Sequence, residues 1–499
     1  MFNKFFSNSE KTNSHEVSED NTTTKKSSKT SRYIVLVICC LLSFGSHFSG
    51  TSLGSLKNIL KKELKISNTQ YGILQASNEL LNTFMPLVSG IVFDIYGSVW
   101  GSLVVSTAIF LGTLIVAISA SISSFPLMVV GRLIYGAGSG AIVGIQESIL
   151  AQWFSEGSLS TVIGVQLSTS RLSTYIGTIT VVPFGEATNW YGNSFYLSAG
   201  LCGFCLLLNV VYSLMITKQN KLVSRSNSAV TINKKKFEWR QLLRLPLVFW
   251  ILMFSQMALG SSWSSFLGFN AEMIKIRFKT TDTIAAYKAS VSQVVPIILP
   301  FVLGIFLDRI GQRLHFYLGS SLLGLLSYIL LGFTNAHPMV AMTIFSFSLA
   351  SGPISNITVL PTILPIKYIG TALGLKKVLT NVGTVILDLL SGYVQDHSKK
   401  KDYKNVMVLF VAISIVSSLL IVWMIGIDYT RFDGAMNAPR KRRLEHMKKK
   451  NQKENIESVD KMQQEDKKPN VISILSISII VATFVAAWTL FIVFYGIYN

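Results

Sequence analysis

Charged residues are scarce in this sequence, and their scarcity argues against a soluble globular protein. Asp, Glu, Lys and Arg make up 14% of the 499 residues, whereas soluble domains carry about 25%. Hydrophobic residues make up 50% of the chain, and the mean hydropathy is +0.46. A chain of this composition is expected to have lipid as its main solvent.

Cysteine is also rare, and the usual motifs of catalysis are missing. The four cysteines all lie within apolar runs, which excludes a disulfide framework and leaves no metal-ligand spacing. They are Cys39, Cys40, Cys202 and Cys205. We find no phosphate-binding loop, nucleophile elbow or zinc motif. We therefore expect neither an enzyme nor a bound cofactor or metal ion.

Apolar segments long enough to cross about 30 Å of hydrocarbon recur along the chain. Six lie in the first half, at 33–56, 68–93, 100–121, 125–153, 161–185 and 193–216. Six more lie at 245–268, 284–307, 314–335, 338–364, 369–394 and 404–427. A thirteenth candidate, 471–498, follows a highly charged stretch. The pattern predicts an all-α membrane protein with two six-helix bundles around a central cavity and an extra C-terminal transmembrane helix.

The predicted domain organisation follows from these segments. It consists of a disordered cytosolic tail at 1–32, an N-terminal bundle at 33–216, a basic linker at 217–244, a C-terminal bundle at 245–427, a charged segment at 428–470 and the extra helix at 471–498. The tail, the linker and the charged segment lie on one side of the membrane if twelve spans separate them, and this side is predicted to be the cytosol because positive loops resist translocation.

The distribution of basic residues supports this orientation, with two exceptions. The formal net charge is +20, and Lys and Arg cluster in the tails and in short segments between apolar runs. Membrane topology explains that distribution better than nucleic-acid binding does. The exceptions are Lys57, Lys61, Lys62 and Lys65 after the first span and Lys399 to Lys401 after the eleventh, which are predicted to face the other compartment.

A charged turn occurs twice, at matching places in the two halves. The second copy reads Gly304-Ile-Phe-Leu-Asp308-Arg309-Ile-Gly311-Gln-Arg313, and the first reads Gly90-Ile-Val-Phe-Asp94-Ile-Tyr-Gly97. The two aspartates are 214 residues apart, as expected for one six-helix half plus a linker. The turn resembles the loop signature of the major facilitator superfamily.

This resemblance implies a gating role for the charged turn. The aspartate and arginines of the second copy can pair across cytosolic helix ends and hold one conformation, and the glycines permit a tight turn. The gating candidates are Asp94, Gly304, Asp308, Arg309, Gly311 and Arg313. The first copy has Ile95 where arginine is usual, so we expect the N-terminal latch to be weaker.

A closer resemblance lies in the fourth and fifth spans. The relevant stretches read Gly131-Arg132-Leu-Ile-Tyr-Gly136-Ala-Gly138-Ser-Gly140 and Gly164-Val-Gln166-Leu-Ser168-Thr-Ser-Arg171. They resemble the lysosomal dipeptide uniporter family known as major facilitator superfamily domain-containing protein 1. The resemblance implies that Arg171 binds a peptide carboxylate and that an acidic residue on the fourth span binds the amine.

The sequence departs from that family at the acidic residue. The family's acidic position falls on Gly140, whereas Glu147 stands seven residues later on nearly the same helix face. Glu147 and Arg171 are predicted at similar depths. Two interpretations stay open: the pair brackets one zwitterion, or it forms a structural salt bridge.

Other polar residues within the spans are candidates for the same site or for proton coupling, since an ionisable group inside a membrane is costly. Gln166 lies five residues before Arg171, and Lys376, Lys377 and Asn381 lie on the eleventh span. Either lysine faces the cavity as a cation for the substrate or reaches to the interface. Glu79 and Asp388 are the proton-coupling candidates.

The leading functional hypothesis is a secondary transporter that moves a small zwitterionic or anionic solute by uniport or proton coupling. Dipeptides or amino acids are favoured by resemblance, as are a lysosomal or vacuolar membrane and a glycosylated accessory subunit. The alternatives are an organic anion or monocarboxylate carrier and a membrane scaffold or receptor that transports nothing. A plasma-membrane location also stays open. Nucleic acid is not an expected partner.

Overall fold

The computed structural model describes residues 29–85, 98–154, 156–223, 245–364, 369–398, 402–439 and 471–498. Within these ranges the chain is helical and contains no strand. The elements of the N-terminal half are α2 (Lys29–Leu42), α3 (Phe44–Ser55), α4 (Lys57–Glu63), α5 (Asn68–Asn82), α7 (Ser98–Ser121), α8 (Phe125–Trp153), α9 (Glu156–Ala187) and α10 (Gly192–Val223).

The C-terminal half repeats the pattern. Its elements are α11 (Leu247–Leu267), α12 (Asn270–Phe278), α13 (Asp282–Ser290), the short helix η2 (Val291–Gln293), α14 (Val295–Ile310), α15 (Arg313–Phe333), α16 (Pro338–Ile363), α17 (Ile369–Asp396) and α18 (Lys404–Arg431). A last helix, α20 (Val471–Tyr498), follows. The all-α architecture and the extra C-terminal helix predicted from the sequence are confirmed.

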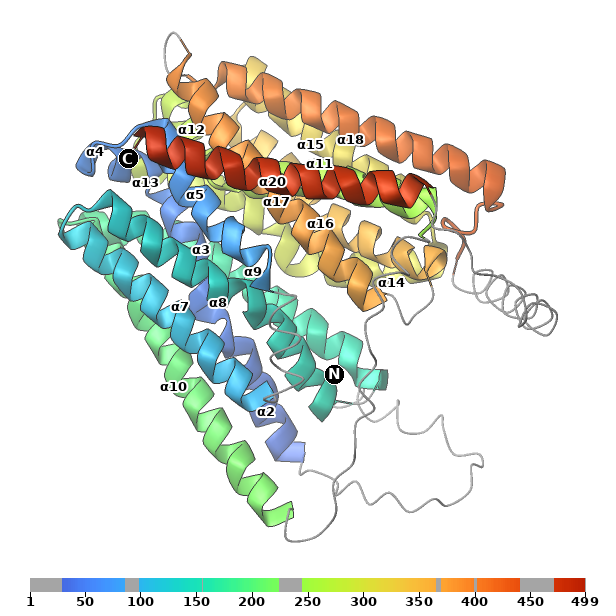
Figure 1. The fold of residues 1–499 in the computed structure, drawn as a ribbon, viewed down its shortest axis with the longest axis horizontal. Helices are drawn as coiled ribbons and strands as arrows, with labels where there is room; N and C mark the ends of the chain where they lie inside the picture. The colour runs from blue at the N-terminus through green and yellow to red at the C-terminus, as the bar shows by residue number, and fades with distance from the viewer. Residues whose placement is uncertain are drawn as a thin grey trace.

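The two halves diverge from one end of the molecule. Their long helices converge at the end that carries α4, α12 and α13 and separate toward the end at which α2 begins (Figure 1). We call these the α4 end and the α2 end. The strongest contact between the halves is made by α5 and α17, and α9 also packs against α13 and α14.

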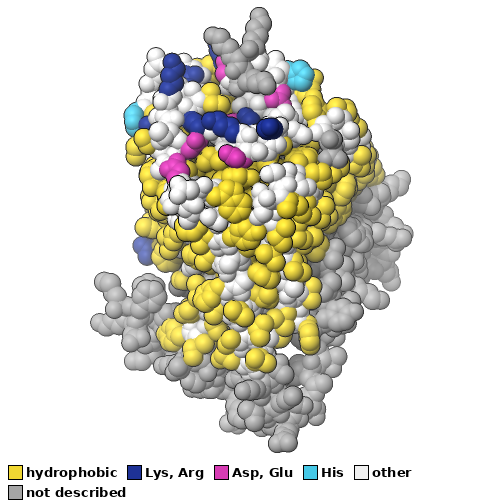
Figure 2. Space-filling model, turned by 90° about the vertical axis from the view of Figure 1, so that its left-hand side faces the viewer, with side chains coloured by type: hydrophobic (Ala, Val, Ile, Leu, Met, Phe, Trp, Pro, Cys, Tyr) yellow, Lys and Arg dark blue, Asp and Glu magenta, His cyan; other side chains and the backbone are white. Residues whose placement is uncertain are grey.

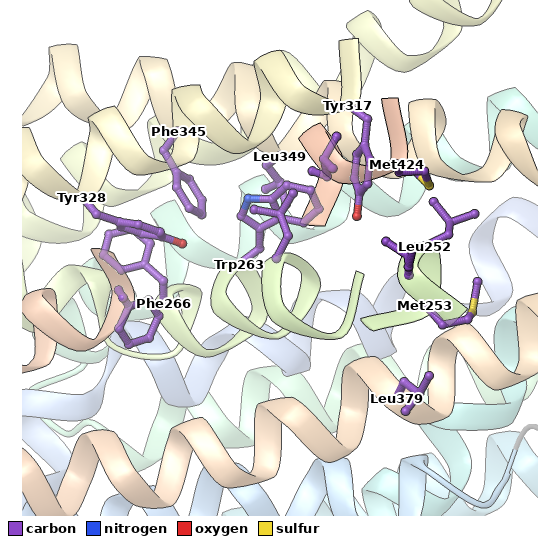
Figure 3. Packing of buried hydrophobic residues seen from close by; sticks show 14 of the residues in the cluster. Leu252, Met253, Trp263, Phe266, Tyr317, Tyr328, Phe345, Leu349, Leu379 and Met424 are labelled. Atoms are coloured by element: carbon purple, nitrogen blue, oxygen red, sulfur yellow. The ribbon is translucent and has the colours of Figure 1, made fainter. Parts of the chain in front are cut away.

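Aromatic side chains fill the interior of the C-terminal half (Figure 3). The ring of Phe266 lies 4.9 Å from that of Phe345 and 5.2 Å from that of Tyr328, in tilted and edge-on arrangements. Trp263 donates a hydrogen bond from Nε1 to Ser348 Oγ at 3.1 Å, so its polar atom is satisfied although the side chain is buried. This core makes the half a well-packed bundle.

Large apolar side chains cover much of the outer surface. Figure 2 shows charged side chains gathered near one end of the molecule, above a broad hydrophobic surface. Leu207, Leu214 and Leu419 are each more than half exposed, at 65%, 58% and 63%. A soluble monomer rarely exposes such a continuous apolar surface, whereas lipid covers it without cost.

Ten helical segments among the described residues are long and apolar enough to cross a membrane. Three expected spans, represented by α5, α9 and α17, are not in that group. These three helices carry Glu79, Arg171 and Lys377, and each makes contacts with the opposite half. The polarity of α9 and α17 is therefore concentrated at the boundary between the bundles, where hydrocarbon does not reach.

Helix α20 runs the full thickness of the molecule beside α17, α5 and α11. Near its start, Ser473 Oγ donates to the carbonyl of Leu245 at 2.9 Å and accepts from Trp250 Nε1 at 3.1 Å. At its other end, the carbonyl of Tyr498 accepts a hydrogen bond from Gln70 Nε2 at 2.7 Å. The helix thus starts against the C-terminal half and ends against the N-terminal half.

This placement predicts the membrane topology of the C-terminus. Because α20 crosses the whole molecule, a tag after Asn499 should lie on the side opposite to a tag before Met1. Protease protection in sealed vesicles measures this directly, with an N-terminal tag on the same chain as the internal control. Cleavage of both tags from the same side would contradict the thirteenth span.

Candidate functional site

Arg171 lies on the face of α9 that meets the C-terminal half. Gly164, seven residues earlier and so nearly in line with it, packs against the ring of Phe301 on α14. Ser168, one turn earlier, donates a hydrogen bond to the carbonyl of Ile297 at 2.8 Å. The Arg171 side chain is half-buried and has no hydrogen bond or ion pair with the described residues. Its guanidinium therefore remains available to a ligand.

Glu147 and Arg171 form no ion pair in the structure. Glu147 is exposed on α8, and the ion pairs among the described side chains are all at the α4 end. Of the two interpretations from the sequence, the structural salt bridge is not what the structure contains. Both charges remain uncompensated by each other, so the bracketing interpretation stays a prediction.

Asn82 explains why position 140 carries no side chain. A Cβ atom on Gly140 would lie 2.5 Å from Asn82 Oδ1, so α5 occupies that space. The amide of Asn82 donates to Glu79 Oε2 at 3.1 Å, and Asn78 Nδ2 donates to Glu79 Oε1 at 2.8 Å. Asn82 thus lies between Gly140 and a carboxylate of α5, a feature that the sequence of α8 alone cannot reveal.

Gln166 belongs to a hydrogen-bond network inside the N-terminal half. Its Nε2 donates to Gln146 Oε1 at 2.9 Å, and Gln146 Nε2 donates to Ser43 Oγ at 2.9 Å and to the carbonyl of Cys39 at 2.5 Å. The Oε1 atom of Gln166 is buried without a hydrogen-bond partner. The network holds α2, α8 and α9 together behind Arg171.

On α17, the two lysines differ in burial. Lys377 is exposed, whereas Lys376 retains only 9% of its accessible surface, and neither ammonium has an ion-pair partner among the described residues. Asn381, one turn later, is buried, and its Nδ2 makes no hydrogen bond. These polar groups come from the C-terminal half, opposite Arg171.

The proton-coupling candidates lie farther toward the α4 end. Asp388 is buried on α17 beside a small cavity that it shares with Gln75 and Ser265 and that has room for about one water molecule. Asp388 interacts electrostatically with Glu79 and Arg132 across the α5–α17 boundary. Arg132 donates from Nε to the carbonyl of Leu74 at 3.4 Å. The structure thus brings both candidate carboxylates near one buried arginine.

A buried ion cluster joins the two halves at the α4 end. Glu272 on α12 contacts Lys57 Nζ at 3.0 Å and Lys61 Nζ at 2.7 Å, both on α4. Lys57 also donates to Tyr403 Oη at 2.8 Å and to Gln395 Oε1 at 3.2 Å, and Tyr403 donates to Glu272. Every member of the cluster therefore has several polar partners, as a buried ion pair requires.

Charge balance sets the protonation of this cluster. Burial alone raises the pKa of Glu272, but Lys57 and Lys61 outweigh it and lower the pKa from 4.5 to about 2. A carboxyl with a depressed pKa contributes stability above its unfolded pKa and loses it only as the pH falls through the folded value. The cluster should thus persist in an acidic compartment.

Close backbone contact between α5 and α17 completes the closure. A Cβ on Gly72 would lie 2.6 Å from the carbonyl oxygen of Asp388, and one on Gly392 would lie 2.4 Å from that of Asn68, so neither position admits a side chain. The Asp396 carboxylate accepts hydrogen bonds from the backbone N–H groups of Asn68 and Thr69, at 3.1 and 2.7 Å. It thereby caps α5 from the opposite half.

The second charged turn packs against the segment that follows α18 and forms hydrogen bonds with it. Gly311 has a φ of +82°, which favours glycine, and its Cβ would lie 2.3 Å from the carbonyl oxygen of Asn437. Arg313 is fully buried and donates to the carbonyls of Ala438 at 2.9 Å and Leu307 at 3.2 Å. Arg313 therefore anchors the turn within its own half.

The other gating candidates are less defined. Arg309 is exposed, and Gly304 packs on Ile354, while the side chain of Asp308 and all of Asp94 lie outside the described residues. Their gating role stays a prediction. No group of His, Cys, Asp and Glu side chains suited to a metal ion occurs in the part of the chain that the structure describes.

The sequence profile of the Major Facilitator Superfamily matches residues 39–271 and 252–499, which together cover most of the chain. The chain belongs to the major facilitator superfamily. It is therefore a multi-pass membrane transporter, and its duplicated turn and paired bundles are features of this family.

Named relatives and solved structures agree with that assignment. The mouse lysosomal dipeptide transporter MFSD1 is 24% identical over 82% of this chain and 88% of its own length. The human protein of the same name is 22% identical over 76% of this chain and 83% of its own length.

Among solved structures, the nucleoside transporter NupG superposes with a TM-score of 0.60 at 16% identity, covering 78% of this chain and 98% of its own. A bacterial homolog of the human lysosomal transporter Spinster, in an inward-facing and unoccupied conformation, superposes with a TM-score of 0.60 at 13% identity. The match covers 80% of this chain and 98% of the homolog. The fold is thus shared with these transporters.

The ion cluster predicts the effect of removing its carboxylate. Glu272→Gln leaves two lysines without their shared counter-charge, which should destabilise closure of the α4 end by several kcal/mol. To measure this, a cysteine is introduced at buried Ser391. We expect it to react with a membrane-impermeant maleimide at least about tenfold faster in the Glu272→Gln variant than in the protein that retains Glu272. The four native cysteines are buried, so background labelling should be low.

Glu63→Gln is the matched control, because Glu63 is an exposed acid on the same helix as the lysines. It should leave the labelling rate unchanged. At about pH 5 labelling slows in every variant because less of the thiol is ionised, but the ratio of the Glu272→Gln rate to the wild-type rate should stay the same, because the pKa of Glu272 lies far below that range. Equal labelling in the Glu272→Gln and Glu63→Gln variants would show that the cluster does not hold this end closed.

Proposed function

We propose that this transporter carries dipeptides across an organelle membrane by alternating access, with Arg171 as the anchor for the substrate carboxylate. The observation that carries the proposal is the half-buried Arg171 guanidinium, which faces the C-terminal half without a hydrogen bond or ion pair among the described residues. A guanidinium binds a carboxylate bidentately and stays charged when partly desolvated. The names of the mouse and human relatives support dipeptides as the substrate class.

The proposed amine site is a carboxylate on the N-terminal half. Glu147 is the candidate from the sequence, and its lack of an ion pair with Arg171 leaves both charges free for one zwitterion. Gln166 and Asn381 supply further polar atoms without partners, one from each half. A buried polar atom that lacks a partner favours a ligand able to satisfy it.

Alternating access is supported by the asymmetry of the two ends. The halves are joined by buried ions and close helix contact at the α4 end and diverge at the α2 end (Figure 1). We propose that the opposite state breaks the Glu272 cluster and brings the charged turns of the α2 end together, as a rocking of one bundle against the other. Arg309 and Asp308 are the proposed contacts in that second state.

The proposed location is a lysosomal or vacuolar membrane, on the strength of the relatives' names. The orientation proposed from the basic segments then puts the α2 end in the cytosol and the α4 end in the lumen. We also propose a glycosylated accessory subunit, because the glycosylation motif at Asn356 is buried inside α16 and cannot carry a glycan.

A second candidate function is the transport of organic anions. The observation that favours it is the pair of unpartnered lysines, Lys376 and Lys377, opposite Arg171. A carrier of this kind would bind one carboxylate between the halves and would not need the amine. Uptake of a simple monocarboxylate in the absence of dipeptide uptake distinguishes this candidate from the first.

The Arg171 anchor predicts the effect of two substitutions. Arg171→Lys should preserve folding and membrane insertion but reduce dipeptide uptake more than about tenfold, since an ammonium cannot bind a carboxylate bidentately. Arg171→Ala should abolish uptake. Counterflow uptake of a labelled dipeptide in proteoliposomes measures both effects, and thermal unfolding of the purified variants checks their folding.

Arg431→Lys is the matched control, because Arg431 is exposed at the end of α18 and remote from α9. It should transport like the wild type. A substrate with an amidated C-terminus should be poorly carried by the wild type and should lose nothing further in Arg171→Ala. Normal uptake by both Arg171 variants would assign this residue a structural role.

A further inference from the structure

Lys377 lies on the stripe of α17 that faces the N-terminal half. It precedes Gln395 by 18 residues, which is five turns, so the two side chains leave the helix in the same direction. Gln395 accepts a hydrogen bond from Lys57 of the N-terminal half at 3.2 Å. Asp388, on the same stripe, lies with Gly72 of α5 around the small cavity. Lys377 therefore points toward the N-terminal half at a level where the halves have separated, which explains its exposure.

Arg171 and Lys377 approach one place from opposite halves. Both interact electrostatically with the imidazole of His47 on α3, although they belong to different bundles. Arg171 shares the face of α9 that meets α14. The two cations thus both lie near His47, and no acidic side chain among the described residues forms an ion pair with either.

Lys376 adds a third basic side chain beside Lys377. It is nine-tenths buried and its ammonium has no hydrogen-bond or ion-pair partner among the described residues. Burial disfavours the charged form of an unpaired amine, so an anion that occupies the site would stabilise the ammonium form of Lys376.

In the proposed site Glu147 pairs with the substrate's amine, and Arg171 pairs with its carboxylate. The positive charge of Lys377 then has no partner when a zwitterion binds. A neutral dipeptide brings one carboxylate and one ammonium and therefore does not neutralise both Arg171 and Lys377. A dipeptide with an acidic side chain brings one further carboxylate.

We propose that the site selects dipeptides that carry a second carboxylate, with Arg171 binding the C-terminal carboxylate and Lys377 binding the acidic side chain. This inference rests on the proposed function and specifies the substrate class within it. Lys377 is then a specificity-determining residue that contacts the substrate directly. Lys376, behind it, raises the local positive potential.

The test compares Ala-Glu with Ala-Gln, which have nearly the same shape and differ by one charge. Each competes for uptake of labelled Ala-Ala by the full-length protein in proteoliposomes. For the wild type we expect half-inhibition at an Ala-Glu concentration about tenfold lower than for Ala-Gln. Lys377→Gln should bring this ratio close to one while leaving competition by Ala-Gln unchanged. Lys377→Glu should reverse the preference in favour of Ala-Lys.

Lys404→Gln provides the matched control, since Lys404 is an exposed lysine at the start of α18. It should retain the wild-type preference. A wild-type ratio near one, or a ratio that persists in Lys377→Gln, would overturn the inference, while Arg171-dependent uptake of Ala-Gln would still support the proposed function. If dipeptides fail to compete, glutarate and its monoamide replace them: a Lys377-dependent preference for glutarate supports the second anionic subsite, and equal competition rejects it.

Discussion

Charge cannot face hydrocarbon without a large cost, and this constraint organises the molecule. Two helices that carry ionisable residues deep in the fold, α9 and α17, are too polar in composition to qualify as lipid-facing spans. Both make contacts across the boundary between the halves. The apolar helices are left to cover the outside, where their exposed leucines and valines meet lipid. Much of the buried charge thereby lies at the surface that must open and close.

Along that boundary the charges are used in two ways. At the α4 end Glu272, Lys57 and Lys61 are paired, buried and supported by Tyr403, so they hold the halves together. Nearer the α2 end Arg171, Lys376 and Lys377 have no ion-pair partners among the described residues. Paired charges stabilise one conformation, whereas unpaired ones need a ligand. The same interface thus contains both paired charges that join the halves and the cations that we propose as anion-binding groups.

Much of this arrangement could be predicted from the sequence. The helical spans, the extra C-terminal helix and the superfamily follow from hydrophobic length and from the duplicated turn. The cluster at Glu272 cannot be predicted in this way, because in the sequence Lys57 and Lys61 stand out only as exceptions to the distribution of positive charge. Their partner lies more than 200 residues away, on a short helix at the end of a span. The place of Asn82 over Gly140 is equally a tertiary fact, which periodicity along α8 cannot reveal.

The central claim is that the halves exchange closure at one end for closure at the other when substrate is carried. Spin labels at Lys62 and Lys404 report on the α4 end, and labels at Trp100 and Tyr429 report on the α2 end, because all four side chains are exposed and each pair joins the two halves. Pulsed electron spin resonance should show a longer 62–404 distance population and a shorter 100–429 population when a dipeptide is added. Two distance distributions that do not respond to the dipeptide, or that change in the same direction, would contradict the account.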